Sequence, residues 1–229
     1  NGIYYFLLPR RKPNNKYDPK QETHWKSIQN QFNPDVVHIH GTELPHGLAY
    51  VRACGNKNVV VSIQGLVSVY ERYYYGGISR LSLLSKITIR DLVRLDTIFM
   101  QHSNLFNRGF FECKTIQSVD HVIGRTSWDK VHTWALKPTA IYHFCNETLR
   151  NEFYNNKWEL DKCEKHSIFL SQAYYPIKGL QKMIEALPLI IQHYPNVKVY
   201  VSGNDFVTNR GWRLNGFGNY IRSLVKKMG

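Results

Sequence analysis

Short apolar runs alternate with amphipathic segments along most of the chain. The runs predict strands because they are brief, rich in β-branched residues and bounded by Gly, Pro or Asn. The expected strands are residues 3–8 and the segments PDVVHIHG, NVVVSIQG, HVIGRT, TAIYHF, SIFLSQA and NVKVYVSGND. The expected helices are residues 21–32, LPHGLAYVRACGNK, SWDKVHTWAL, NETLRNEFY, residues 179–193 and NYIRSLVKKMG. This alternation indicates parallel sheets in an α/β protein.

Two segments depart from the alternation. Residues 66–119 are loosely helical in pattern, and we place no strand there. Residues 154–166 are polar and charged, which is typical of a linker. We therefore expect a domain boundary after residue 163, with one domain at 1–163 and a second at 164–229. At a finer level, Asn146 is expected to cap the helix NETLRNEFY, and Pro188 is expected to kink the helix that contains it.

Ligands of open α/β sheets bind beyond the carboxyl ends of the strands. The segments at these positions are HIHG, SIQG, GRTSWD, YPIKG and VSGND. Lys178 and Gly179 open an amphipathic helix, where free backbone N–H groups and the positive end of the helix dipole favour a phosphate. The alternative is a solvated lysine beside a tight turn, and the spacing alone does not choose between the two.

The order of these segments resembles glycosyltransferase family four. The resemblance rests on a strand followed by YPIKG, an amphipathic helix ending in EAL, and then YPNVKVYVSG. Upstream, PDVVHIHG, VVVSIQG and HVIGRTSWDK are similar to strands of that family's acceptor domain. The resemblance implies a GT-B-like fold of two Rossmann-like parallel-sheet domains, both incomplete here. Residues 1–163 would form the acceptor side, and residues 164–229 would begin the donor side.

The same resemblance implies a function. It implies transfer of a sugar from a nucleotide-diphosphate sugar to a glycan or a polyprenyl-linked acceptor, with retention and without a metal or other cofactor, in surface polysaccharide biosynthesis. Lys178 and Gly179 would bind the donor diphosphate, and Gly203 and Asn204 would lie near the nucleotide. The acceptor side would be lined by Gly41, Gln64, Gly65, Arg125 and Thr126. No residue is assigned as the catalytic base.

The chain departs from the family pattern in several places. Ala173 stands where the family often has an Arg, and Gln64 stands where it often has a His. Gln64 forms hydrogen bonds but cannot act as an acid or base, and a plain turn residue is its alternative role. The family's Glu-x7-Glu motif and its first strand with a Gly-rich loop are not in the sequence, which starts with Asn1. We therefore expect a fragment of a longer enzyme, and a non-catalytic module that binds a nucleotide or a partner stays open as the alternative.

Composition limits the partners. Lys and Arg total 30 against 17 for Asp and Glu, so the formal net charge is +13, while the 43% of hydrophobic residues excludes a disordered chain. A basic surface attracts nucleotide sugars, polyprenyl phosphates, anionic membranes and nucleic acid alike. Nucleic acid is disfavoured because the basic residues are scattered and no recognition motif occurs. With no apolar run of about 18 residues and no signal peptide, we expect a cytoplasmic protein, peripheral at the inner face of the membrane.

Four further groups of residues have chemical potential. His38 and His40 lie two apart on a strand and could bind a metal with His46 or Cys54, although structural histidines are favoured. Asp129 and Glu147 could pair as two carboxylates, although a helix-capping role is favoured for Asp129. Arg125 could bind an anion or form a surface ion pair.

The aromatic loop contains Tyr70, Tyr73, Tyr74 and Tyr75. These tyrosines could stack on sugar rings, contact a membrane, or simply pack against the rest of the protein. The cysteines, without a CxxC pair, are expected to be reduced thiols.

Overall fold

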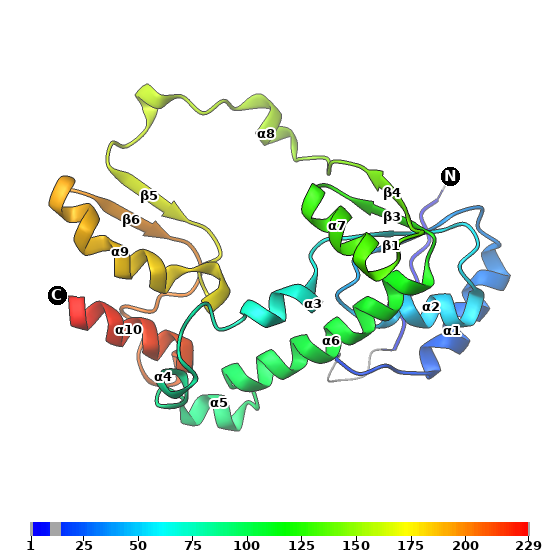
Figure 1. Ribbon diagram of the computed structural model, residues 1–229, viewed down its shortest axis with the longest axis horizontal. Coiled ribbons are helices and arrows are strands. Elements are labelled where there is room, and N and C mark those ends of the chain that lie inside the picture. Colours follow the sequence, from blue (N-terminus) through cyan, green and yellow to red (C-terminus); the bar gives the residue numbers. More distant parts are fainter. Residues whose placement is uncertain (1, 10–14, 229) are drawn as a thin grey trace. The chain divides into compact units, whose positions relative to one another are not determined.

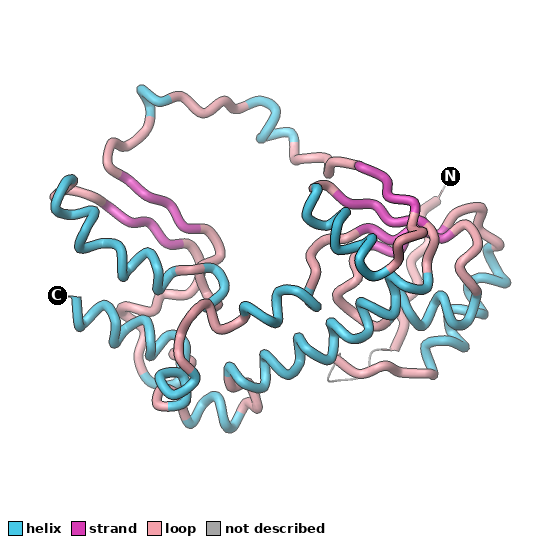
Figure 2. Tube along the Cα trace, viewed as in Figure 1, coloured by secondary structure: helices cyan, strands magenta, loops and turns pink. Residues whose placement is uncertain are grey.

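The computed structural model describes residues 2–9 and 15–228 (Figure 1). The protein is α/β, and its strands form one parallel sheet of four strands and one parallel pair (Figure 2). The chain divides into two compact units. Unit 1 comprises Asn1–Arg72 and Ser103–Thr148, and unit 2 comprises Tyr73–His102 and Leu149–Gly229. The expected class, α/β with parallel sheets, is confirmed.

The sheet of unit 1 has the order β1-β2-β3-β4. Its strands are β1 (Val37–His40), β2 (Val59–Ser62), β3 (His121–Gly124) and β4 (Ile141–Phe144), each within a segment expected to be a strand. Parallel strands need crossover connections, which here contain helices. All four carboxyl ends therefore lie at one edge of the sheet, where the expected acceptor-side residues follow the first three strands.

The helices of unit 1 bury the centre of this sheet. They are α1 (Lys20–Phe32), α2 (His46–Cys54), α3 (Val67–Tyr70), the greater part of α6 (Ile98–Ser118) and α7 (Ser127–Leu136). Val61 of β2, Val122 of β3 and Ile116 of α6 are fully buried in one cluster, which Tyr50 of α2 joins. Burial of such β-branched side chains contributes roughly 1.5–3 kcal/mol each, so β2 and β3 form the most protected part of the unit.

Unit 2 combines a β/α segment with an insertion from earlier in the chain. Its parallel strands are β5 (Ser167–Leu170) and β6 (Lys198–Val201). Its helices are α4 (Arg80–Leu84), α5 (Ile89–Val93), the first turn of α6, α8 (Asn151–Asn155), α9 (Leu180–His193) and α10 (Gly216–Met228). The expectation that residues 66–119 contain helices and no strand is confirmed.

Two buried polar side chains connect the insertion to the rest of unit 2. Asp91 of α5 accepts a hydrogen bond of 2.7 Å from the backbone N–H of Gly216, where α10 begins. The amide of Gln181 in α9 donates to the carbonyl oxygens of Gly76 and Pro176, both at 2.8 Å. Because residues 73–102 pack in unit 2, the compact units do not follow a contiguous division at residue 163.

Two local expectations differ from the structure. Residues 3–8 form no strand: Leu7 is 97% exposed, although the rings of Tyr4 and Phe6 contact the ring of Phe32. An apolar run becomes a strand only where a neighbouring strand takes its backbone hydrogen bonds. Asn146 caps no helix, because α8 begins at Asn151 and has no side-chain cap. α9 continues past Pro188, and the kink expected there stays a prediction.

Candidate functional site

The loops that follow β5 and β6 meet at one edge of the unit 2 sheet. The N–H of Ser202 donates to the carbonyl of Leu170 at 3.0 Å, and the N–H of Gln172 donates to the hydroxyl of Ser202 at 3.2 Å. A Cβ on Gly203 would lie 3.4 Å from the ring of Tyr174. Gln172 and Tyr174 thus lie beside Ser202 and Gly203, and Lys178, Gly179 and Asn204 follow in the same two loops. We call Lys178, Gly179, Gly203 and Asn204 the unit 2 strand-end cluster.

The first turn of α9 is open to a ligand. A short 3₁₀ turn, Pro176–Lys178, leads to Gly179, whose φ of 81° is left-handed and favours glycine. No side chain caps the helix, and no atom lies within 4 Å of the position that a Cβ on Gly179 would take. The first N–H groups of a helix have no partner inside the helix. An anion at this place would receive these N–H groups and the positive end of the dipole of a 14-residue helix.

Lys178 adds a positive charge beside this turn. Its side chain is exposed and forms no ion pair within the described part of the chain. Gly203, with a φ of 114°, keeps the neighbouring loop free of a side chain, and the exposed Asn204 follows it. The cluster therefore offers a cation, free backbone donors and a surface that a flat ligand can approach closely.

A fifth residue, which the sequence did not single out, fixes the shape of this turn. Gln181 is fully buried and holds the carbonyl of Pro176, two residues before Lys178. Its own Oε1 is buried without a hydrogen-bond partner in the described structure. Nothing in the sequence marks Gln181 as different from any exposed glutamine in a helix. Its role as a buried hydrogen-bond donor depends on the loop at Gly76, which packs over it in the folded protein.

The five residues expected on the acceptor side follow β1, β2 and β3 in unit 1. Their positions are connected: Arg125 Nη2 donates to the carbonyl of Gln64 at 3.2 Å, and a Cβ on Gly41 would lie 3.7 Å from Cγ of Gln64. We call Gly41, Gln64, Gly65, Arg125 and Thr126 the unit 1 strand-end cluster.

The charge of Arg125 is already paired. Its Nη1 lies 2.8 Å from a carboxylate oxygen of Glu147, and the two side chains are 33% and 48% exposed. Of the two roles open for Arg125, the structure has the ion pair, so an anionic ligand there would have to displace Glu147. A partly exposed pair of this kind contributes at most about 1 kcal/mol.

Thr126 and Asp129 form a capping box at the start of α7. The hydroxyl of Thr126 accepts from the N–H of Asp129 at 3.2 Å, and Asp129 accepts from the N–H of Thr126 at 3.0 Å. Burial by itself raises the pKa of Asp129, but hydrogen bonds from Arg125, Tyr142 and Thr126 outweigh it and lower the pKa below its ordinary 3.8. The capping role favoured by the sequence is confirmed.

Glu112 is a buried acid that the sequence analysis missed. It lies on α6 with no exposed surface, and it accepts hydrogen bonds from the hydroxyl of Thr42 at 2.7 Å and the N–H of Ser68 at 2.8 Å. Burial raises its pKa above the ordinary 4.5, against the opposing effect of these hydrogen bonds. Its only sequence signal is an acid within the apolar stretch FFECK. Glu112 connects α6 to the loop that follows β1 and to α3, which follows β2.

The histidine pair of β1 is exposed, whereas Tyr70, Tyr74 and Tyr75 contact neighbouring side chains. His38 and His40 are exposed on β1 with ring centres 5.8 Å apart, and within residues 2–9 and 15–228 no three potential ligands are placed to hold a metal ion. Tyr74 is buried and donates a hydrogen bond to Gln101. Tyr75 stacks on His102 at 4.9 Å. In unit 1, Tyr70 stacks on Trp128 with ring centres 6.0 Å apart.

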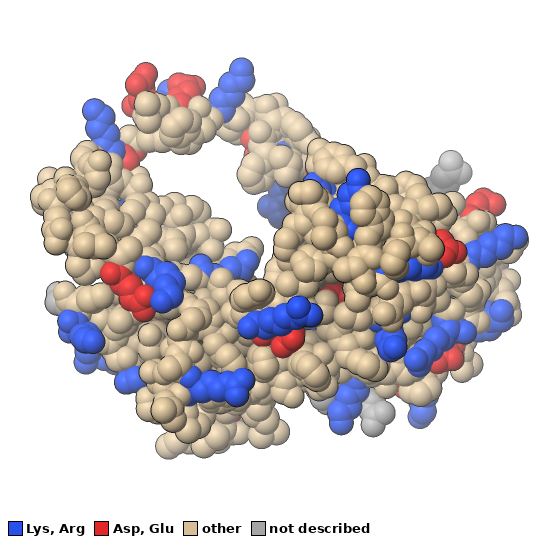
Figure 3. Space-filling view, in the orientation of Figure 1, with Lys and Arg blue, Asp and Glu red and all other residues tan. Residues whose placement is uncertain are grey.

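Basic side chains are spread over the visible face rather than gathered in one patch (Figure 3). Of the helices in the described ranges, none is both long and apolar enough to cross a bilayer.

No protein-family model matches the chain, and comparison with curated proteins and with solved structures gives no match either.

Proposed function

We propose that this chain is part of a glycosyltransferase of GT-B fold that uses a nucleotide-diphosphate sugar. The observation that supports this most directly is the open first turn of α9, with Lys178 beside it and the loop of Gly203 and Asn204 at the same sheet edge. Lys178, Gly179 and the first N–H groups of α9 would bind the diphosphate. Gly203 and Asn204 would lie along the nucleotide.

The proposed chemistry places positive charge where the leaving group develops negative charge. As the bond between the sugar and the diphosphate breaks, Lys178 and the helix dipole would stabilise the released diphosphate. No metal is then required for this role, and we propose a metal-independent transfer with retention. The acceptor, a glycan or a polyprenyl-linked sugar, would approach the unit 1 strand-end cluster. The reaction would take place at the cytoplasmic face of the membrane.

A calorimetric titration with UDP, GDP and their sugars tests this proposal. We expect saturable binding of one nucleotide, weakened about tenfold or more in Lys178→Ala, because a charge-assisted contact to phosphate contributes roughly 1.5–3 kcal/mol. Lys165→Ala is the matched control. It removes an exposed lysine before β5, at the opposite end of the same strand. Equal losses in the two variants, or no nucleotide binding at all, would contradict the assignment.

A second candidate is a non-catalytic nucleotide-binding module. It is favoured by Ala173, which is 1% exposed and packed in the core where the family often has a second cation. The ion pair of Arg125 with Glu147 also favours this candidate, because it leaves no free cation at that position. Nucleotide binding that depends on Lys178, without any transfer or hydrolysis of the sugar, would favour this candidate. Salt-sensitive binding of a single-stranded oligonucleotide alone would instead favour a basic nucleic-acid-binding protein.

A further inference from the structure

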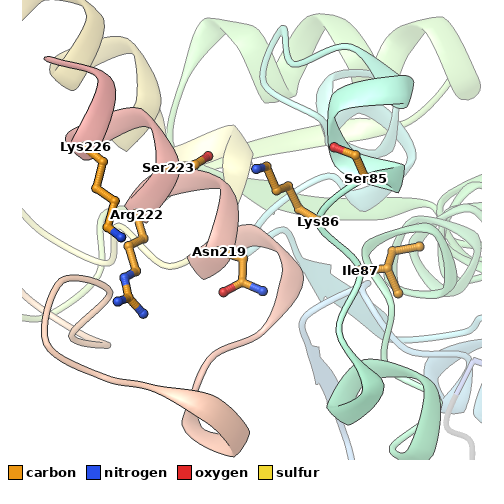
Figure 4. A pocket seen from close by; sticks show the side chains of 7 residues that line it. All are labelled: Ser85, Lys86, Ile87, Asn219, Arg222, Ser223 and Lys226. Carbon is orange, nitrogen blue, oxygen red and sulfur yellow. The ribbon is translucent and has the colours of Figure 1, made fainter.

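A cavity of about 360 Å³ in unit 2 lies apart from the strand-end cluster (Figure 4). One wall is the connection between α4 and α5, and the other is α10. Its lining residues are Ser85, Lys86, Ile87, Asn219, Arg222, Ser223 and Lys226. None of them belongs to the unit 2 strand-end cluster.

The spacing of residues along α10 builds one wall. Positions 222 and 223 lie three and four residues after 219, and 226 lies four and three residues after them, so the four positions share one face of the helix. Ile221, on another face, is 1% exposed and anchors α10 in the core. The start of the helix is fixed by the hydrogen bond from the N–H of Gly216 to Asp91 on α5. The two walls are therefore held by the same packed unit.

The lining is basic and contains no acid. Lys86 reaches in from one wall, and Arg222 and Lys226 come from the other (Figure 4). None of these three side chains has an ion pair or a hydrogen bond in the described part of the chain. The amide of Asn219 is likewise without a partner there and supplies a further donor. Each serine hydroxyl, by contrast, already donates to a backbone carbonyl, Ser85 to Ser82 and Ser223 to Tyr220.

Like charges that face one cavity repel one another unless an anion separates them. The planar guanidinium of arginine matches the oxygens of a phosphate in a two-pronged contact, and lysines add point charges. A ligand with more than one negative charge uses several cations at once. We propose that this cavity binds the phosphate groups of a phosphorylated ligand, either free in solution or at the head of a lipid.

The first test is a calorimetric titration of the full chain with inorganic pyrophosphate. Lys178→Ala serves as the background, so that binding at the strand-end cluster does not contribute. We expect Lys86→Gln and Arg222→Gln each to weaken binding about tenfold or more. Lys227→Gln is the matched control, because it removes an exposed cation next to Lys226 that does not line the cavity. Unchanged thermal unfolding midpoints would show that the variants are folded.

The second test identifies the source of the phosphate. The same variants are sedimented with vesicles of phosphatidylcholine and phosphatidylglycerol in equal parts, and with phosphatidylcholine vesicles alone. Binding of pyrophosphate but not of vesicles, lost in Lys86→Gln and Arg222→Gln, supports a soluble ligand. Vesicle binding lost in the same two variants supports a lipid head group. Binding of neither probe, or an equal loss in Lys227→Gln, overturns the proposal. Failure of nucleotide binding at Lys178 would leave this result unaffected.

Discussion

Unit 1 and unit 2 both contain parallel strands rich in apolar residues, but the units bury these strands differently. In unit 1, Val59 and Val61 of β2 are 1% and 0% exposed. In unit 2, Phe169 of β5 is 69% exposed and Tyr200 of β6 is 47% exposed. The comparison teaches that strands of similar composition can form in both units, whereas the burial of each strand depends on the elements packed against it.

The strand-end clusters differ in a related way. In unit 1 the polar groups satisfy one another: Arg125 pairs with Glu147, and Thr126 pairs with Asp129 in the capping box. In unit 2 the first turn of α9 has no side-chain cap, and Lys178 has no ion pair in the residues described. A site whose donors are already satisfied binds a charged ligand weakly, so the open cluster of unit 2 is the better candidate for the diphosphate of the proposed donor.

The largest expected difference between the units concerns the core. Ile116→Ala in unit 1 should lower the free energy of unfolding by about 2–5 kcal/mol, because Ile116 is fully buried and its loss leaves a cavity. Phe169→Ala in unit 2 should change it by about 0.5 kcal/mol or less. Urea unfolding of the two variants checks this. A similar loss in both would mean that Phe169 is covered, contrary to the comparison.

The second prediction concerns the contact that holds the insertion in unit 2. Gly76 has a φ of 57°, and a Cβ there would lie 2.7 Å from the carbonyl carbon of Pro176. Gly76→Ala should lower the free energy of unfolding by roughly 1–3 kcal/mol through strain and the clash. Gly211→Ala is the control, with a φ of 56° and no atom within 4 Å. Thermal unfolding should show the smaller loss for Gly211→Ala, and equal losses would exclude the clash.

The third prediction tests the satisfied cluster of unit 1. Thr126→Ala should cost about 1 kcal/mol, the usual effect of losing a helix cap. For Asp129, the folded-state pKa is lowered, so its stabilising effect is present above the unfolded value near 3.8 and is lost as pH falls through the folded value. The difference in unfolding temperature between the wild type and Asp129→Asn should therefore shrink in strong acid. A constant difference at all pH values would show that the carboxylate charge is unimportant.

The smallest expected effect belongs to Glu112. Burial raises its pKa, so the folded protein retains a proton that the unfolded chain releases. The contribution of Glu112 to stability is therefore complete below about 4.5 and declines as pH rises through the folded value. Glu112→Gln keeps the shape but does not titrate. The stability of the variant relative to the wild type should increase from acid to neutral pH, as measured by urea unfolding. A decrease would reverse the assigned direction of the pKa.

Local signals explain what was predicted correctly. The six strands and most of the helices were expected because periodicity, Gly, Pro and capping residues act over a few positions. The strand predicted at residues 3–8 was wrong, because this apolar segment has no neighbouring strand to pair with. The resemblance to a known family grouped the unit 1 cluster residues, which follow strands that end at one edge, and Arg125 does reach Gln64. The partner that neutralises Arg125, Glu147, was considered only in relation to Asp129.

The sequence alone determined the alternation of strands and helices, the parallel class, and the position of Lys178 and Gly179 at the start of a helix. These features depend on residues close together in the chain. Tertiary packing decided that residues 73–102 join unit 2, that Glu112 and Gln181 are buried, and that Lys86 and Arg222 line one cavity. These features bring together residues that are far apart in the chain, such as Lys86 and Arg222, which are 136 positions apart. No local pattern encodes them, because the packing of the elements depends on how much apolar surface the whole assembly removes from water.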